Sequence, residues 1–219
     1  MNNLHKLTID NNLPVSHLQF FPSIAELILF EKLRKVSIDV YENFQKQTFR
    51  NRCIVLSSQG LINITVPVQR NKNEKILLKD AKISYNENWN VWTWRTIFSC
   101  YGKSPFFLYY ADKVKEILNT KFEYLMDLNI ETFFFIKHTM NLEQEIFLTS
   151  EFITRKENNY RDMFLTKNRV SDGKKQEAYY QCFSSKFEFQ TNLSALDLLF
   201  NLGPESETYV KNAVQHSFL

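Results

Sequence analysis

The beginning of the chain shows the pattern of a strand, a helix and a second strand. Apolar residues are frequent in the short runs 15–21 and 35–40, which is typical of strands. Between these runs, Pro22 ends the first strand, and Ser23 is a suitable N-cap for a helix that ends at about Leu33. This order of elements is that of a βαβ unit, so we expect the two strands to run parallel.

A β-hairpin is predicted next, because two apolar runs, 50–58 and 61–68, flank a Gln-Gly turn. The first run carries apolar residues on both faces, which is typical of a strand in the centre of a sheet. Pro67 ends the second run, and 81–85 is expected to form another short strand.

From Trp89 onwards, the apolar residues recur at helical spacing. Trp94, Phe98 and Tyr101 would share one face of a helix. The fold that the whole pattern predicts is α/β: an N-terminal βαβ unit in a mixed sheet, a helical segment at about 89–140, and a C-terminal strand and helix region that completes one domain, 1–219. The further elements that we expect are helices at 89–102, from Ser104, at 120–140, at 194–201 and from about 205 to 214, and strands at 145–153 and 178–183.

The composition is that of a globular protein. A chain of 219 residues with 44% hydrophobic and 23% charged residues can bury a core without cross-links. Its three cysteines are odd in number and show no CxxC spacing, which argues against a disulfide framework and for a reducing compartment. The segment 1–12 is polar, and no apolar run is long enough to span a bilayer. We therefore expect a cytoplasmic protein without a membrane span.

The positive charge is concentrated in one segment. The net charge is +3, and the segment 155–175 alone holds seven Lys or Arg against three Asp or Glu. A nucleic-acid-binding protein usually has a broader basic face, so a nucleic-acid partner is disfavoured. Two interpretations of the segment fit equally well: a mobile basic loop beside an anionic ligand, or a solvated loop.

Several known kinds of site are absent from the sequence. With four glycines, neither GxGxxG nor GxxxxGK[ST] can be written, so the common phosphate-binding loops are missing. The four histidines are scattered, which gives no support to a zinc site. Cys53 lies in an apolar strand, where a cysteine is more often a small core residue than a nucleophile. No metal is predicted, and no cofactor is indicated.

The best candidate site is the segment 46–52, which leads into a predicted strand. Because the strand period is two, Arg50 and Arg52 would share a face, and their guanidinium groups match carboxylate or phosphate. Lys46 would add a positive charge, and Asp39 ends the second strand of the βαβ unit, where ligands of open α/β sheets gather. The competing interpretation is that these residues form ion pairs at the surface, and the local pattern alone slightly favours it.

Two further positions carry alternatives. Gln19 lies where the first strand meets its helix, a turn that binds the ligand in many α/β enzymes, although it could be an ordinary connection. Ser194 and Asp197 have the spacing of a capping box, with Ser at the N-cap and the acid three residues later. A structural role for Asp197 therefore competes with a catalytic one.

At these residues the chain resembles the WbqC-like family of bacterial proteins. The resemblance covers nearly the whole chain in the family's order, although Ser23 stands where most relatives have Trp. The segments that carry it are LQFFPS (18–23), FQKQTFRNR (44–52), LINITVPV (61–68), WRTIFSCYGKSPFF (94–107), YYQCF (179–183) and NLSALDLLFNLGPE (192–205). The residues that match the family position by position are Lys46, Asn51, Arg52, Tyr101, Lys103, Gln181, Asp197 and Asn201.

The resemblance implies a cytoplasmic protein, with some relatives associated with surface-polysaccharide (O-antigen) biosynthesis. Our first hypothesis is a transferase that acts on an amino-sugar nucleotide or a similar anionic substrate by acyl or aminoacyl transfer. Lys46, Asp39 and Asp197 would take part in catalysis. The residues that would bind the substrate are Gln19, Asn51, Arg52, Tyr101, Lys103, Gln181 and Asn201. The alternative hypothesis is a non-enzymatic binding or scaffold protein of the same pathway, whose many aromatic residues form a partner surface.

Overall fold

A parallel sheet of three strands forms one part of the molecule. The computed structural model describes residues 7–69, 75–163 and 176–215. The strands β1 (Val15–Ser16), β2 (Lys35–Ile38) and β5 (Glu145–Leu148) lie in the order β1-β2-β5. Helix α1 (Ile24–Leu33) joins β1 to β2, which confirms the predicted βαβ unit. The carboxyl ends of all three strands therefore meet at one edge of the sheet.

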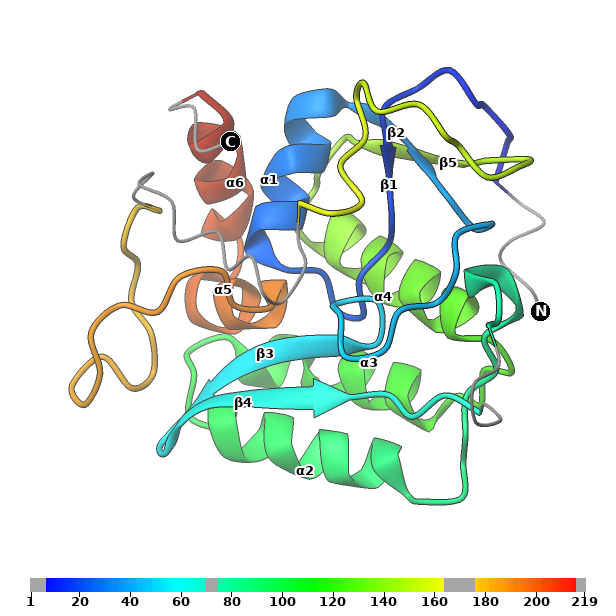
Figure 1. The fold of residues 1–219 in the computed structure, drawn as a ribbon. Helices are drawn as coiled ribbons and strands as arrows, with labels where there is room; N and C mark the ends of the chain where they lie inside the picture. Colours follow the sequence, from blue (N-terminus) through cyan, green and yellow to red (C-terminus); the bar gives the residue numbers. More distant parts are fainter. Residues whose placement is uncertain (1–6, 70–74, 164–175, 216–219) are drawn as a thin grey trace.

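Helix α1 begins where the sequence predicts. The Ser23 hydroxyl accepts a hydrogen bond from the Glu26 backbone N–H at 3.2 Å, as an N-cap does. Its apolar residues lie all round the helix and are buried. The C-terminal helices α5 (Ala195–Leu202) and α6 (Glu205–Gln215) pack against α1 and cover it (Figure 1).

The hairpin forms a separate, two-stranded sheet. Strands β3 (Arg52–Ser57) and β4 (Gly60–Thr65) are antiparallel, with Arg52 opposite Thr65 and Ser57 opposite Gly60. The prediction that β3 is a central strand is wrong, because β4 is its only strand neighbour in the described part of the chain. Its two apolar faces have another cause: β3 packs between α2 and α5.

Three helices make up the middle of the chain. The helix predicted from Trp89 is confirmed as α2 (Trp89–Tyr101), and it lies beneath the β3–β4 hairpin in Figure 1. The next two begin later than predicted, since residues 104–106 form a turn and 120–124 contain no helix. Their bounds are Phe107–Asn119 for α3 and Leu125–Thr139 for α4, and a short 3-10 helix, η2, spans Leu78–Asp80.

The predicted strands at 81–85 and 178–183 do not form. Within the described part of the chain, residues 81–85 form only two isolated β-bridges, between Lys82 and Tyr124 and between Ile83 and Val68. The 179–183 segment instead binds α5 through its side chains, as described below. The strand predicted over 145–153 ends at Leu148, because the chain then turns and the Ile153 N–H binds the Asp39 carboxylate.

The turn between α5 and α6 depends on one glycine. Gly203 has a φ of +56°, a conformation that glycine adopts without steric cost. A Cβ atom there would lie 2.5 Å from the Phe106 ring. The predicted α/β class is confirmed, with the parallel and antiparallel strands in two sheets. No helix in the described ranges combines the length and apolar character needed to cross a bilayer.

Candidate functional site

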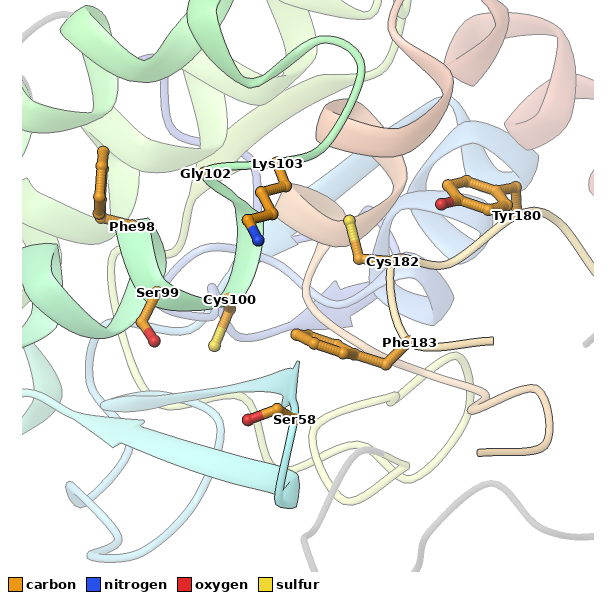
Figure 2. Close-up of a pocket in the computed structure, with 9 residues that line it drawn as sticks. All are labelled: Ser58, Phe98, Ser99, Cys100, Gly102, Lys103, Tyr180, Cys182 and Phe183. Atoms are coloured by element: carbon orange, nitrogen blue, oxygen red, sulfur yellow. The ribbon is translucent and has the colours of Figure 1, made fainter. Parts of the chain in front are cut away.

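A pocket opens where α2, the end of the hairpin and the segment after residue 178 meet (Figure 2). Its volume is about 630 Å³, which is the size of a small-molecule site. Aromatic rings, two thiols, two serine side chains and one lysine form the wall. The lining residues are Ser58, Phe98, Ser99, Cys100, Gly102, Lys103, Tyr180, Cys182 and Phe183.

Lys103 supplies the positive charge of this pocket. It follows Gly102, the C-cap of α2, and it is exposed. Figure 2 shows its side chain reaching into the space bordered by Cys100, Cys182 and Phe183. Its ammonium group forms no ion pair with any residue that the structure describes. An anionic group of a ligand could therefore bind here without competing with a carboxylate of the protein.

The two thiols of the pocket are protonated at neutral pH. Burial raises the pKa of Cys100 to about 11, and the nearby charge of Asp197 acts in the same direction. Burial also raises the pKa of Cys182, against the effect of its hydrogen bond with the Ser104 hydroxyl at 2.8 Å. Because the thiolate is the nucleophilic form, neither cysteine has the environment of an activated nucleophile.

Asp197 lies behind this wall, in α5. The Tyr179 hydroxyl donates a hydrogen bond to its carboxylate at 2.6 Å, and the Gln181 side-chain amide donates another at 3.3 Å. The Tyr101 hydroxyl also lies near this carboxyl and favours its charged form, which lowers its pKa, although the geometry is not that of an ordinary hydrogen bond. Burial outweighs these polar neighbours and raises the pKa of Asp197 to about 6. The group can therefore exchange a proton near neutral pH.

The contacts of Asp197 separate the two interpretations of its sequence motif. Ser194 is the N-cap of α5 and accepts a hydrogen bond from the Leu196 N–H at 3.3 Å, as predicted. The second half of a capping box is missing, because the Ser194 N–H binds the Ile54 carbonyl instead of the Asp197 carboxylate. The Asp197 side chain is thus free to bind the 179–181 segment.

This arrangement gives the 179–183 segment two sides. Tyr179 and Gln181 turn to Asp197, while Tyr180, Cys182 and Phe183 line the pocket. Gln181 also exchanges two hydrogen bonds with the Gln190 backbone, at 2.8 and 3.0 Å. Asp197 and Gln181 therefore hold the strip of chain that forms one wall of the pocket.

Five of the residues predicted for the site belong to this pocket or its support. Lys103 lines it, and Tyr101, Gln181 and Asp197 interact behind it. Asn201 links helix α5 to the pocket wall. Its side-chain amide donates a hydrogen bond to the Asp197 backbone carbonyl at 2.8 Å, and its side-chain oxygen accepts one from the Cys182 thiol at 3.4 Å. We call these five residues the pocket group.

The other predicted residues lie outside this pocket. Gln19 accepts a hydrogen bond from the Ser23 N–H at 3.0 Å, and Asn51 donates one to the Val66 carbonyl at 2.9 Å. Arg52 is half-buried at the start of β3, and Lys46 is exposed on a turn. None of these four residues lines the pocket, so their role in binding stays a prediction.

Asp39 and Arg50 are buried and already paired. Asp39 accepts hydrogen bonds from the Arg161 guanidinium, from the Ile153 N–H at 3.2 Å and from the Tyr41 N–H at 3.0 Å. Arg50 is 0% exposed and binds Glu42 through a two-bond fork, at 2.5 and 2.6 Å. The local pattern did not indicate the partners Glu42 and Arg161, because only the fold brings them to these positions.

The basic segment at 155–175 is described in its first part only. Arg155 donates hydrogen bonds to the carbonyls of Asn11 and Leu13, and Arg161 binds Asp39. These two arginines attach the chain to the parallel sheet. The predicted mobile loop also includes 164–175, which lies outside the described residues.

The described residues contain no group of three or more His, Cys, Asp or Glu side chains placed to hold a metal ion. The chain matches no curated protein and no solved structure. Residues 20–172 match the model of the WbqC-like protein family, which is more than half of the 219 residues. The family resemblance of the sequence is thereby confirmed over these residues, whereas the resembling segments 179–183 and 192–205 lie outside the matched range. The chain belongs to the WbqC-like protein family.

Proposed function

We propose that this protein is a transferase of bacterial surface-polysaccharide or related metabolite biosynthesis, and that its pocket binds an amino-sugar nucleotide or a similar anionic substrate. The observation that carries the proposal is the ammonium group of Lys103, which has no ion-pair partner among the described residues and lies in a pocket with aromatic walls. Family membership supports the biological setting.

The chemistry of the pocket suits such a ligand. The rings of Phe98, Tyr180 and Phe183 offer apolar faces on which a nucleobase or a sugar ring can stack. Lys103 can neutralise a phosphate as a point charge. The volume of about 630 Å³ lies within the range that holds a ligand of this size.

The reaction that we propose is acyl or aminoacyl transfer to the amino group of the acceptor. The amine nitrogen would form a bond to the acyl carbon, the bond from that carbon to its carrier would break, and the amine would lose one proton to a base. The thiols of Cys100 and Cys182 are unsuited to carry the acyl group, since both are held protonated.

For Asp197 the contacts favour a positioning role over the predicted catalytic one. Its side chain is 1% exposed and lies outside the lining of the pocket. It holds Tyr179 and Gln181, and through them the wall that carries Tyr180 and Cys182. Direct proton transfer between Asp197 and a substrate stays a prediction.

The test is a titration of the protein with UDP-glucosamine, followed by calorimetry and by thermal unfolding. We expect Lys103→Gln to weaken binding by about tenfold or more, because the charge-assisted hydrogen bond from the ammonium group to a phosphate of the ligand is lost. Lys121→Gln is the matched control, since it removes an exposed lysine outside the pocket. Equal affinity of wild type and Lys103→Gln, or no binding at all, would refute the proposal.

One observation favours the alternative function of a binding or scaffold protein. Helices α2 and α3 expose large apolar side chains, among them Trp92 at 64%, Leu108 at 83% and Tyr109 at 77%. Such residues are frequent in the centres of protein interfaces. Replacing Trp92 and Leu108 by Ser separates the two functions: loss of a stoichiometric protein partner with intact UDP-glucosamine binding would favour the scaffold.

A further inference from the structure

A second concentration of polar groups lies at the carboxyl edge of the parallel sheet, outside the pocket. In open α/β sheets this edge is the usual place for a ligand. His17 follows β1, and Asp39 follows β2. We call the following residues the sheet-edge group: His17, Glu26, Asp39, Glu42, Arg50 and Arg161, all of which are buried.

Four members of the sheet-edge group neutralise one another. Arg161 pairs with Asp39, and Arg50 pairs with Glu42. These two ion pairs leave no net charge among the four residues. They also fix the orientation of Arg50, because Glu42 binds two of its three guanidinium nitrogens.

The remaining polar atoms make no hydrogen bond of ordinary geometry with the described residues. These atoms are both carboxyl oxygens of Glu26, both ring nitrogens of His17 and the third guanidinium nitrogen of Arg50 (Nη1). All three side chains are 0% exposed. The Gln19 backbone lies near Glu26, and the Arg161 backbone lies near His17. A buried polar atom without a partner is destabilising, so its presence calls for an explanation such as a bound molecule, a bound ion or a functional role.

Burial and the neighbouring charges shift the pKa values of Glu26 and His17 in opposite directions. Burial raises the pKa of Glu26, against the smaller effects of the Gln19 backbone and the Arg50 charge. Burial lowers the pKa of His17, and the positive charges of Arg50 and Arg161 add to this effect, against the smaller opposing effect of the Arg161 backbone. Without a ligand, burial therefore favours the neutral form of both groups. An added cation would find an acceptor in Glu26, and an added anion would find donors in Arg50 and His17.

We infer that the sheet-edge group is a binding site for a small zwitterion, in the simplest case a free amino acid. The ammonium group would bind the Glu26 carboxylate, which would release its proton to solvent on binding, and the carboxylate of the ligand would accept hydrogen bonds from Arg50 Nη1 and His17. A zwitterion suits this site better than a simple ion because each of its two charges would meet a group that can bind it, Glu26 on one side and Arg50 on the other.

The segment that follows β5 covers this site. It returns past β1, with a bridge between Asn159 and Val15 (Figure 1). Arg161, in this segment, forms an ion pair with Asp39 and donates a hydrogen bond to the Ile153 carbonyl at 2.6 Å. The Arg161 guanidinium also lies 4.6 Å from the centre of the exposed Phe152 ring. Entry of an amino acid would require this short segment to move outwards.

The test uses the whole chain and the common protein amino acids, each titrated singly and followed by calorimetry and thermal unfolding. Methylamine and acetate serve as the two halves of a zwitterion. We expect at least one amino acid to bind and to raise the midpoint of unfolding, while neither half does so at the same concentration.

Two variants locate the binding. Glu26→Gln keeps the shape of the side chain and removes its charge, so it should fold and weaken amino-acid binding by about tenfold or more. Lys103→Gln alters the pocket and should leave amino-acid binding unchanged. Three outcomes would overturn the inference: no amino acid binds, acetate binds as tightly as the amino acid, or Glu26→Gln binds as well as the wild type. None of them bears on UDP-glucosamine binding in the pocket.

Discussion

Replacing Asp197 by Asn removes a carboxyl group that we expect to control how stability changes with pH. Burial raises the pKa of this carboxyl from its ordinary value of 3.8 to about 6 in the folded protein. The folded state therefore holds the proton more tightly than the unfolded state does. Between these two pKa values, the free energy of unfolding falls as the pH rises. The reason is that the unfolded chain loses the Asp197 proton readily, whereas the folded protein keeps it until the pH approaches 6.

The size of the effect follows from the pKa difference. One pKa unit corresponds to about 1.4 kcal/mol, so the full cost of ionising Asp197 in the folded protein is about 3 kcal/mol. Between pH 4 and pH 7, about 2.4 kcal/mol of this cost should be observed, because the unfolded carboxyl is already half ionised at pH 4. Asp197→Asn cannot ionise, so it should not lose this stability.

The assay is urea unfolding of both proteins at a series of pH values from 4 to 7. The quantity to follow is the free energy of unfolding of the wild type minus that of Asp197→Asn. Other titrating groups, such as Glu26 and His17, are present in both proteins and largely cancel. We expect this difference to fall by about 2.4 kcal/mol from pH 4 to pH 7. A difference that stays constant over this range would refute the reasoning about Asp197.

Three further predictions concern the core, a turn and the thiols. Glu42→Gln leaves the buried guanidinium of Arg50 without its partner and should reduce the free energy of urea unfolding by about 3–5 kcal/mol, whereas Glu123→Gln, in an exposed pair, should reduce it far less. Similar losses in both variants would contradict this. Gly203→Ala should lower stability by more than about 1 kcal/mol, since the residue needs a positive φ and the space that a methyl group would fill. An unchanged midpoint of thermal unfolding would count against it. Iodoacetamide should modify Cys182, which is half-exposed, well before the two buried cysteines, and peptide mass spectrometry would detect any other order.

The elements that depend on local pattern could be predicted from the sequence. The βαβ unit, the hairpin and helix α2 form in the predicted order, and Ser23 caps α1 as indicated. The first strand is shorter than the predicted 15–21, since β1 covers only Val15–Ser16 and therefore ends well before Pro22. These signals are local, because a cap or a breaker acts on its own turn of chain. The 179–183 segment shows where local reasoning fails: its apolar residues suggest a strand, yet its side chains are divided between Asp197 and the pocket.

The candidate site could be predicted in part. The family resemblance indicates Tyr101, Lys103, Gln181, Asp197 and Asn201, and the structure brings these five together. Periodicity could not show this, since α2 is far along the chain from both the 179–183 segment and α5.

The segment 46–52 was the favoured site from the sequence, and it has a different arrangement. Arg50 and Arg52 were expected to share the rim of a strand, but β3 begins only at Arg52, and Arg50 is buried against Glu42. The identity of a buried partner depends on the tertiary fold, and nothing in the spacing of Glu42 and Arg50 indicates an ion pair rather than two surface charges. The sheet-edge group therefore became visible only in the structure.

The central claim, that the pocket binds an anionic ligand with a ring, is tested most directly by ligand protection of Cys182. This thiol lines the pocket beside Lys103, so a bound ligand should shield it. The measurement is the rate of Cys182 modification by iodoacetamide with and without saturating UDP-glucosamine. The account predicts that the ligand slows the reaction by about tenfold or more in the wild type and has much less effect in Lys103→Gln at the same concentration. An unchanged rate under conditions where calorimetry shows saturation would place the ligand elsewhere and contradict the claim.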